Sequence, residues 1–155
     1  MAISLNKIVD HIRNRPYMSG VARDELRVKS TSEIFTPTPL VQKVLGHTPK
    51  EYFTDPSKTV CDPSCGDGQF LGEVLIRRIE NGIEFEQALS TIYGVDIMAE
   101  NVEQCRERLL CGQEHLKHIV EKNIVCADAL RYHYRFDGSD PYKTAKDIHF
   151  DRLFD

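Results

Sequence analysis

The chain of 155 residues is long enough for one globular domain with its own hydrophobic core. Its apolar content of 41% and charged content of 28% are ordinary for a soluble protein, and its net charge of −4 argues against a uniformly basic protein that coats DNA. The N-terminus lacks the apolar run of a signal peptide, and no stretch is as long and apolar as a membrane span. We therefore expect a cytoplasmic location, or the host cytoplasm if the source is a virus.

Charge is distributed unevenly along the chain. Residues 1–29 carry six Lys and Arg against three Asp and Glu, a net charge of +3, so the remainder carries −7. Apolar residues at helical spacing predict a helix over about residues 4–14, which ends before Pro16. We expect residues 1–30 to form a basic N-terminal helix and arm. This unit is either a solvated amphipathic helix or a contact for DNA or an acidic partner.

A second helix is predicted to begin at Thr38, where a capping residue is followed by proline, and to end at Gly46. Phe35, Thr36 and Pro37 lead into this helix. From their position alone, Phe35 and Pro37 could simply pack the entry to the helix.

Residues 62–70, DPSCGDGQF, follow a short β-prone run and open into an apolar helix. They predict a strand, a glycine loop and a helix, a common layout of a nucleotide pocket. Gly66 and Gly68 allow a sharp turn and a close approach to a ligand. Asp62 and Asp67 would repel a pyrophosphate but suit a ligand with an ammonium, a sulfonium and a nucleoside. S-adenosylmethionine is such a ligand.

Two further strands are predicted before aspartates. Residues 91–95 lead to Asp96, and residues 124–127 lead to Asp128. Asp96 can accept hydrogen bonds from two ribose hydroxyls or cap the next helix. The alternation of strands and helices predicts an α/β fold, a three-layer sandwich in which helices cover both faces of a parallel sheet. The ligand is expected at the carboxyl ends of the strands.

The helix predicted over residues 98–110 has an apolar and a polar side. We expect its core positions to be Val102, Cys105, Leu109 and Leu110. We expect its solvent-facing positions to be Glu103, Arg106, Glu107 and Arg108.

Five cysteines occur at irregular spacing, which indicates reduced, buried, small side chains. The spacing matches no zinc pattern, so we expect no metal site. Near the other end of the chain, residues 132–136, YHYRF, are expected to pack on the sheet, the alternative being base stacking with phosphate contacts. Residues 140–142 are expected to form a turn.

Four segments, taken in order, resemble the motifs of the adenine-specific DNA methyltransferases. They are residues 34–37 (IFTP), 62–70 (DPSCGDGQF), 93–97 (YGVDI) and 126–130 (CADAL), and the resemblance covers roughly residues 31–136. It implies a Rossmann-like methyltransferase domain over residues 31–155, S-adenosylmethionine as the cofactor and DNA as a partner.

The resemblance also implies roles for single residues. Thr36 would contact the carboxylate of the cofactor, Ile97 would lie against its adenine, and Asp128 would accept a hydrogen bond from the adenine amino group. The alternative for Asp128 is a turn-forming aspartate. The implied cofactor-binding residues are Phe35, Thr36, Pro37, Asp62, Pro63, Cys65, Gly66, Gly68, Phe70, Asp96, Ile97, Asp128 and Ala129.

One part of the family pattern is missing. In the family, a Phe-Asp pair begins a fourth strand, which leads to an Asn/Asp-Pro-Pro-Tyr/Phe tetrad that holds the flipped adenine. No Pro-Pro pair occurs in the 155 residues, so we expect a truncated domain without catalytic residues of its own.

We expect the chain to supply the cofactor pocket of a methyltransferase, while a partner chain or a second copy supplies the base-binding motif. The alternatives are a subunit of a split methyltransferase and a non-catalytic, S-adenosylmethionine-binding regulatory or anti-restriction module. Three strands and a short fourth would leave an exposed sheet edge, so self-association is also expected.

Overall fold

The computed structural model describes residues 2–14 and 36–142. The predicted arm over residues 15–30, Phe35 and the predicted fourth strand lie outside these ranges. None of the helices within them combines the length and the apolar character that crossing a membrane requires. In chain order the elements are α1 (Leu5–Arg13), α3 (Thr38–Leu45), α4 (Glu51–Thr54), β1 (Val60–Asp62), α5 (Gln69–Glu80), α6 (Phe85–Ser90), β2 (Ile92–Asp96), α7 (Ala99–Leu110), the 3-10 helix η1 (Glu114–Leu116), α8 (Lys117–Asn123) and β3 (Ile124–Cys126).

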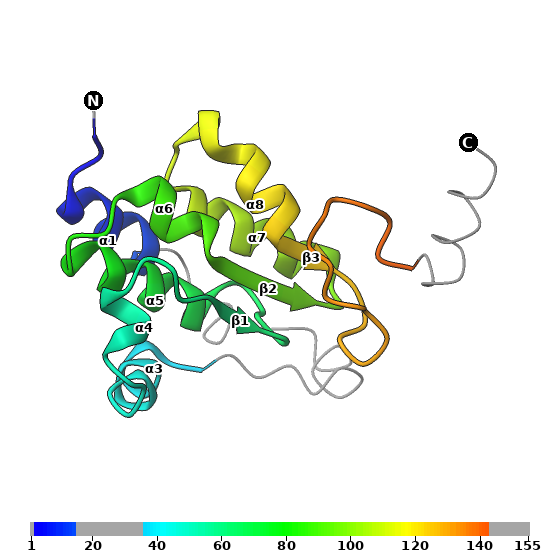
Figure 1. Ribbon diagram of the computed structural model, residues 1–155, viewed down its shortest axis with the longest axis horizontal. Coiled ribbons are helices and arrows are strands. Elements are labelled where there is room, and N and C mark those ends of the chain that lie inside the picture. Colours follow the sequence, from blue (N-terminus) through cyan, green and yellow to red (C-terminus); the bar gives the residue numbers. More distant parts are fainter. Residues whose placement is uncertain (1, 15–35, 143–155) are drawn as a thin grey trace.

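The three strands form one parallel sheet in the order β1-β2-β3, and Figure 1 shows their arrows side by side, pointing the same way. Val60 pairs with Ile92, and Gly94 pairs with Ile124. Parallel neighbours need crossover connections, which contain α5 and α7 here. The chain therefore has the predicted α/β architecture, with a small open parallel sheet.

The main core lies on the sheet face to which Ile92 and Gly94 belong. Gly94 allows α5 to approach β2, because a Cβ at this position would lie 2.9 Å from Leu71 Cδ1. The residues predicted as the core of α7 are all buried, as expected: Val102, Cys105, Leu109 and Leu110. Burial of these apolar side chains is the main term that stabilises the sheet against the helices.

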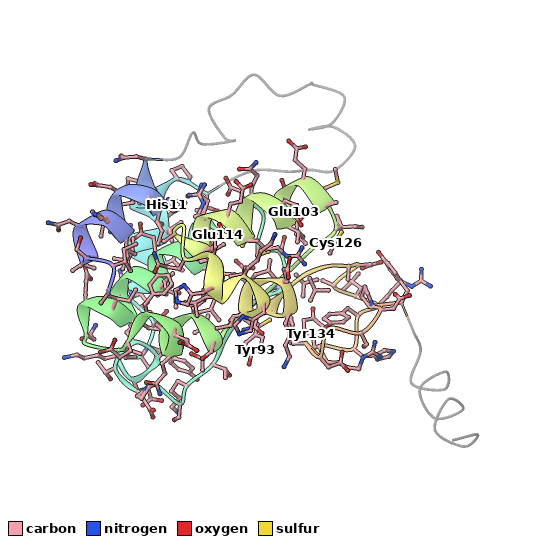
Figure 2. The ribbon with its side chains drawn as sticks, turned by 90° about the horizontal axis from the view of Figure 1, so that it is seen from above. His11, Tyr93, Glu103, Glu114, Cys126 and Tyr134 are labelled. Atoms are coloured by element: carbon pink, nitrogen blue, oxygen red, sulfur yellow. The ribbon has the colours of Figure 1, made fainter. Side chains whose placement is uncertain are left out.

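The opposite sheet face carries Tyr93 and Val95, and the segment after β3 covers it. Tyr132 is buried here, and the Phe136 ring centroid lies 4.7 Å from that of Tyr93. Figure 2 shows Tyr93 and Tyr134 on the same side of the sheet. The expected packing of the aromatic run is thus confirmed. Within the described ranges, the buried cluster on this face consists of residues from β2, β3 and the segment that follows β3.

Helix α1 shares the main core with the elements that follow residue 36. Ile8 and Ile12 are fully buried, and Ile12 packs so closely on α5 that a Cβ at Gly72 would lie 2.7 Å from its Cγ2. Arg13 forms two hydrogen bonds with the Glu73 carboxylate, at 2.8 and 2.9 Å. The basic helix predicted at the N-terminus is therefore packed on the domain along its apolar side.

The prediction that Arg108 faces solvent is wrong. Arg108 is buried, and its guanidinium lies 3.0 Å from the buried carboxylate of Asp67 in the loop before α5. A charged group is buried in a protein only where an opposite charge or hydrogen bonds compensate it, and each residue of this pair does so for the other. Glu103, Arg106 and Glu107 are exposed or partly exposed, as predicted.

All five cysteines are free thiols, in line with the prediction. Cys65, Cys105 and Cys111 are buried, whereas Cys126 is partly exposed and Cys61 is exposed. Cys61 is exposed because it lies on the second sheet face of β1, at the edge of the described sheet. The prediction of burial is therefore confirmed for Cys65, Cys105 and Cys111, is wrong for Cys61 and holds only in part for Cys126.

Arg78 on α5 holds together the segments around the amino ends of the strands. It is fully buried, and its guanidinium donates to the carbonyls of Tyr52, Lys58 and Ala88 and to the hydroxyl of Thr91. Burial lowers the pKa of Arg78. These bonds connect α4, the segment before β1, α6 and the segment before β2.

We predict that Arg78→Met destabilises the protein by about 3 kcal/mol, because several buried oxygen atoms lose their donor at once. Urea unfolding followed by circular dichroism measures the change. Arg131→Met, on an exposed loop, is the control and should change the free energy of unfolding by less than about 0.5 kcal/mol. Equal effects of the two substitutions would contradict the role given to Arg78.

Candidate functional site

A tight loop at the carboxyl end of β1 forms the floor of the site. Gly66 and Gly68 have φ angles of 53° and 90°, in the left-handed region that favours glycine. The Cys65 N–H donates to the Val95 carbonyl at 2.9 Å, and the Gly68 N–H donates to the Cys65 carbonyl at 2.9 Å. The sharp turn predicted from the two glycines is present. Helix α5 begins at Gln69, because Gly68 is its left-handed N-cap.

A cavity of about 450 Å³ opens above this loop, at the carboxyl ends of β1 and β2. Its size falls in the range of about 300–1,000 Å³ that is usual for small-molecule sites, and its position is where open parallel sheets bind their ligands. Eight of the predicted cofactor-binding residues line it: Thr36, Asp62, Pro63, Cys65, Gly66, Phe70, Asp96 and Ile97. Three separate segments of the sequence therefore meet at one cavity.

Four predicted residues that the structure describes do not line the cavity: Pro37, Gly68, Asp128 and Ala129. Asp128 lies beyond the end of β3, and its Oδ1 accepts the Leu130 N–H at 2.9 Å. This contact is the turn that was the alternative role for Asp128. The remaining predicted residue, Phe35, lies outside the described residues.

The sequence did not identify about half of the cavity lining. The additional residues are Leu45, Val60, Cys61, Ser64, Gln69, Leu71, Val74 and Met98. Helical periodicity could have identified Val74, because it lies one turn after Phe70 on α5. Leu45 reaches the cavity from α3 through tertiary packing, for which the sequence gives no local signal.

The Asp96 carboxylate accepts three hydrogen bonds from its own domain. Its Oδ1 accepts from the Met98 N–H at 2.8 Å and from the Asn101 side-chain amide at 3.1 Å, and its Oδ2 accepts from the Gly66 N–H at 3.1 Å. Because a carboxylate offers about four acceptor positions, little capacity remains for two ribose hydroxyls. The N-cap of α7 is Met98, so Asp96 supports the start of this helix without being its cap residue.

The Asp62 carboxylate is the other acid on the cavity wall. Its Oδ1 accepts the Ser64 N–H at 3.0 Å. Burial raises the pKa of Asp62 above its ordinary value of 3.8, the bond from Ser64 lowers it, and the nearby charge of Asp96 raises it further. Two carboxylates on one partly enclosed wall favour a cation over an anion as the ligand.

Asp67 does not belong to this acidic wall. Its side chain is 1% exposed and is turned into the core, where it pairs with Arg108. The prediction that Asp62 and Asp67 both favour a cationic ligand is therefore wrong for Asp67, because Arg108 already balances its charge. Asp62 and Asp96 form the acidic pair instead.

The thiols around the loop are poor nucleophiles. A hydrogen bond with the Cys105 thiol and burial raise the pKa of Cys65, and burial raises the pKa of Cys61. A raised pKa keeps a thiol protonated, whereas the thiolate is the reactive form. In the part of the chain that the structure describes, no group of three or more His, Cys, Asp and Glu side chains is placed to hold a metal ion.

Comparison of the chain with protein-family models, with curated proteins and with solved structures found no match.

We predict that Gly68→Ala destabilises the protein more than Gly82→Ala. Both glycines have a positive φ, 90° and 87°, so both variants carry similar backbone strain. Only Gly68 is also crowded, because a Cβ there would lie 3.0 Å from Cys105 Sγ, whereas a Cβ at Gly82 would meet nothing within 4 Å. The excess cost should be about 1–3 kcal/mol, measured by urea unfolding. Equal costs would show that the loop has room for a side chain.

Proposed function

We propose that the chain binds S-adenosylmethionine in the cavity above the glycine loop and that its sheet and helices are part of a Rossmann-like methyltransferase fold. One observation carries the proposal: Asp62 and Asp96 share the wall of a cavity of about 450 Å³ at the carboxyl ends of two parallel strands. A ligand with a positive charge matches this wall better than a phosphate does.

The remaining lining suits the rest of the cofactor. Gly66 has no side chain, so a ligand can approach the loop backbone closely. Ile97 is 63% exposed at the cavity, although it is a large apolar residue. An adenine ring lying against Ile97 and Phe70 would remove this apolar surface from water. Thr36 supplies a hydroxyl for the cofactor carboxylate.

The four ordered motifs support the further proposal that the chain is related to the adenine-specific DNA methyltransferases. In this proposal it supplies the cofactor pocket, and a partner polypeptide or a second copy supplies the group that binds the adenine of DNA. A second candidate is a non-catalytic S-adenosylmethionine-binding module that regulates or inhibits a restriction-modification system, because the cavity alone would suffice for that role.

Calorimetric titration with S-adenosylmethionine tests the binding site. We expect binding to the unmodified protein and an affinity at least about tenfold lower for Asp62→Asn, a loss of about 1.4 kcal/mol. Glu86→Gln removes an exposed charge on α6 that does not line the cavity, and it should leave the affinity unchanged. No heat with the unmodified protein at a saturating cofactor concentration would refute the site.

The same titrations at several pH values make the test more specific. A cation binds the ionised form of Asp62, so affinity should fall as the pH is lowered through the pKa of Asp62, which burial raises above 3.8. Asp62→Asn should have a flatter profile. A raised carboxyl pKa also means that ionised Asp62 opposes folding of the ligand-free protein above this pKa. Asp62→Asn should therefore melt at a higher temperature at neutral pH without cofactor.

A methyl-transfer assay distinguishes the two candidate functions. We expect no N6-methyladenine in DNA incubated with labelled cofactor and pure protein, because no base-binding tetrad occurs in these residues. Addition of cell extract as a source of the partner should produce methylated DNA, and Asp62→Asn should reduce it. Product from the pure protein would contradict the need for a partner. No product with extract, together with cofactor binding, would favour the non-catalytic module.

A further inference from the structure

A buried ion pair lies directly beneath the glycine loop and has no part in the cavity lining. Arg108 Nη2 donates to Asp67 Oδ2 at 3.0 Å, and the two side chains are 4% and 1% exposed. Asp67 stands between Gly66 and Gly68, the two residues with left-handed backbone angles. An ion pair that fixes the direction of the Asp67 side chain therefore also restrains the loop backbone on both sides of Asp67.

Arg108 contacts more than the Asp67 carboxylate. Its Cδ lies 3.4 Å from the position that a Cβ of Gly68 would take and 3.5 Å from that of Gly72. Its Nη1 donates to the Ile12 carbonyl on α1 at 3.0 Å. A single side chain of α7 thus contacts the loop, the first turn of α5 and the last turn of α1.

The loop is held from its other side by a second carboxylate. Asp96 Oδ2 accepts the Gly66 N–H at 3.1 Å from the direction of the cavity, while Asp67 is held by Arg108 from the direction of the core. Two glycines in three residues give this backbone more conformations than an ordinary turn has. Contacts on both sides select one of these conformations before a ligand arrives, which lowers the cost of binding.

We propose that Arg108 is a positioning residue for the cofactor site. It does not line the cavity, and it acts through Asp67, whose ion pair keeps the loop in the conformation that the ligand requires. Because Arg108 also donates to the Ile12 carbonyl, the packing of α1 on the domain helps to hold Arg108 in place beneath the loop. This inference rests on the proposed binding of S-adenosylmethionine.

The test is a double-mutant cycle in which the dissociation constant for S-adenosylmethionine is measured by calorimetry on the full chain. Arg108→Met and Asp67→Asn should each raise the dissociation constant by about tenfold or more, and the double variant should be within about twofold of the weaker single variant. Arg108→Lys should recover part of the affinity. The matched control is Arg106→Met on the same helix, because Arg106 donates to the Ile124 carbonyl and not to the loop. It should change the constant by less than about twofold.

Thermal unfolding without ligand identifies a temperature at which each variant is folded. All titrations are made at that temperature, so a loss of affinity reports on positioning of the loop and not on unfolding. A folded Arg108→Met protein with unchanged affinity would overturn the proposal, as would additive effects in the cycle. If Arg108→Met does not fold, Asp67→Asn and Arg108→Lys decide the question by the same criterion. If no variant of the pair folds, the pair is a requirement of folding alone and the proposal is rejected.

If the proposed cofactor binding is wrong, the result differs from that of a failed role for Arg108. The unmodified protein would then show no binding of the cofactor. In that case hydrogen exchange still tests the positioning role: Arg108→Met should speed exchange at the Gly66 and Gly68 amides relative to the unmodified protein, while the Gly82 amide should exchange at the same rate in both. Equal exchange at the loop in the two proteins would refute the role of Arg108.

Discussion

The backbone passes through the left-handed region twice within three residues, at Gly66 and Gly68, and much of the molecule supports this turn. Strand β2 provides the Val95 carbonyl, which accepts a hydrogen bond from the start of the loop, and the Asp96 carboxylate, which accepts the Gly66 N–H. Helix α7 provides Arg108 beneath the loop. Neighbouring elements therefore hold a conformation that two glycines alone would leave open to many alternatives.

Three aspartates close to this turn have three different environments. Asp62 faces the cavity and has few internal partners, Asp96 faces the cavity with three internal donors, and Asp67 is buried against Arg108. Only the first two can act on a ligand. The difference follows from the direction of each side chain, because Asp62 and Asp96 line the cavity whereas the Asp67 side chain lies in the core.

The regular elements and their order could be predicted from the sequence, because apolar periodicity and glycine positions are local signals. Arg108 could not. Its spacing from Cys105 places it on the buried side of α7, but a charged residue is expected in solvent unless a distant partner is known. The sequence also gave no reason for Gly72, which makes room for Ile12 of a helix 60 residues earlier in the chain. Both cases depend on tertiary contacts between segments that are far apart in sequence.

The candidate site could also be predicted only in part from the sequence. The aspartates Asp62 and Asp96 are brought to one cavity because parallel strands end at the same edge of the sheet. Asp128 was grouped with them as the end of a third strand, yet β3 ends at Cys126 and the chain then turns toward the second sheet face. The turn at Asp128 is the alternative that the local sequence left open.

A titration with S-adenosylmethionine followed by ¹H–¹⁵N correlation spectra tests the central claim most directly. The account predicts concentration-dependent shifts of the Gly66 and Ile97 amides, while the amides of Gly82 and Gly112, which do not line the cavity, stay in place. Spectra that do not change at a saturating concentration, or changes confined to residues outside the cavity, would contradict it.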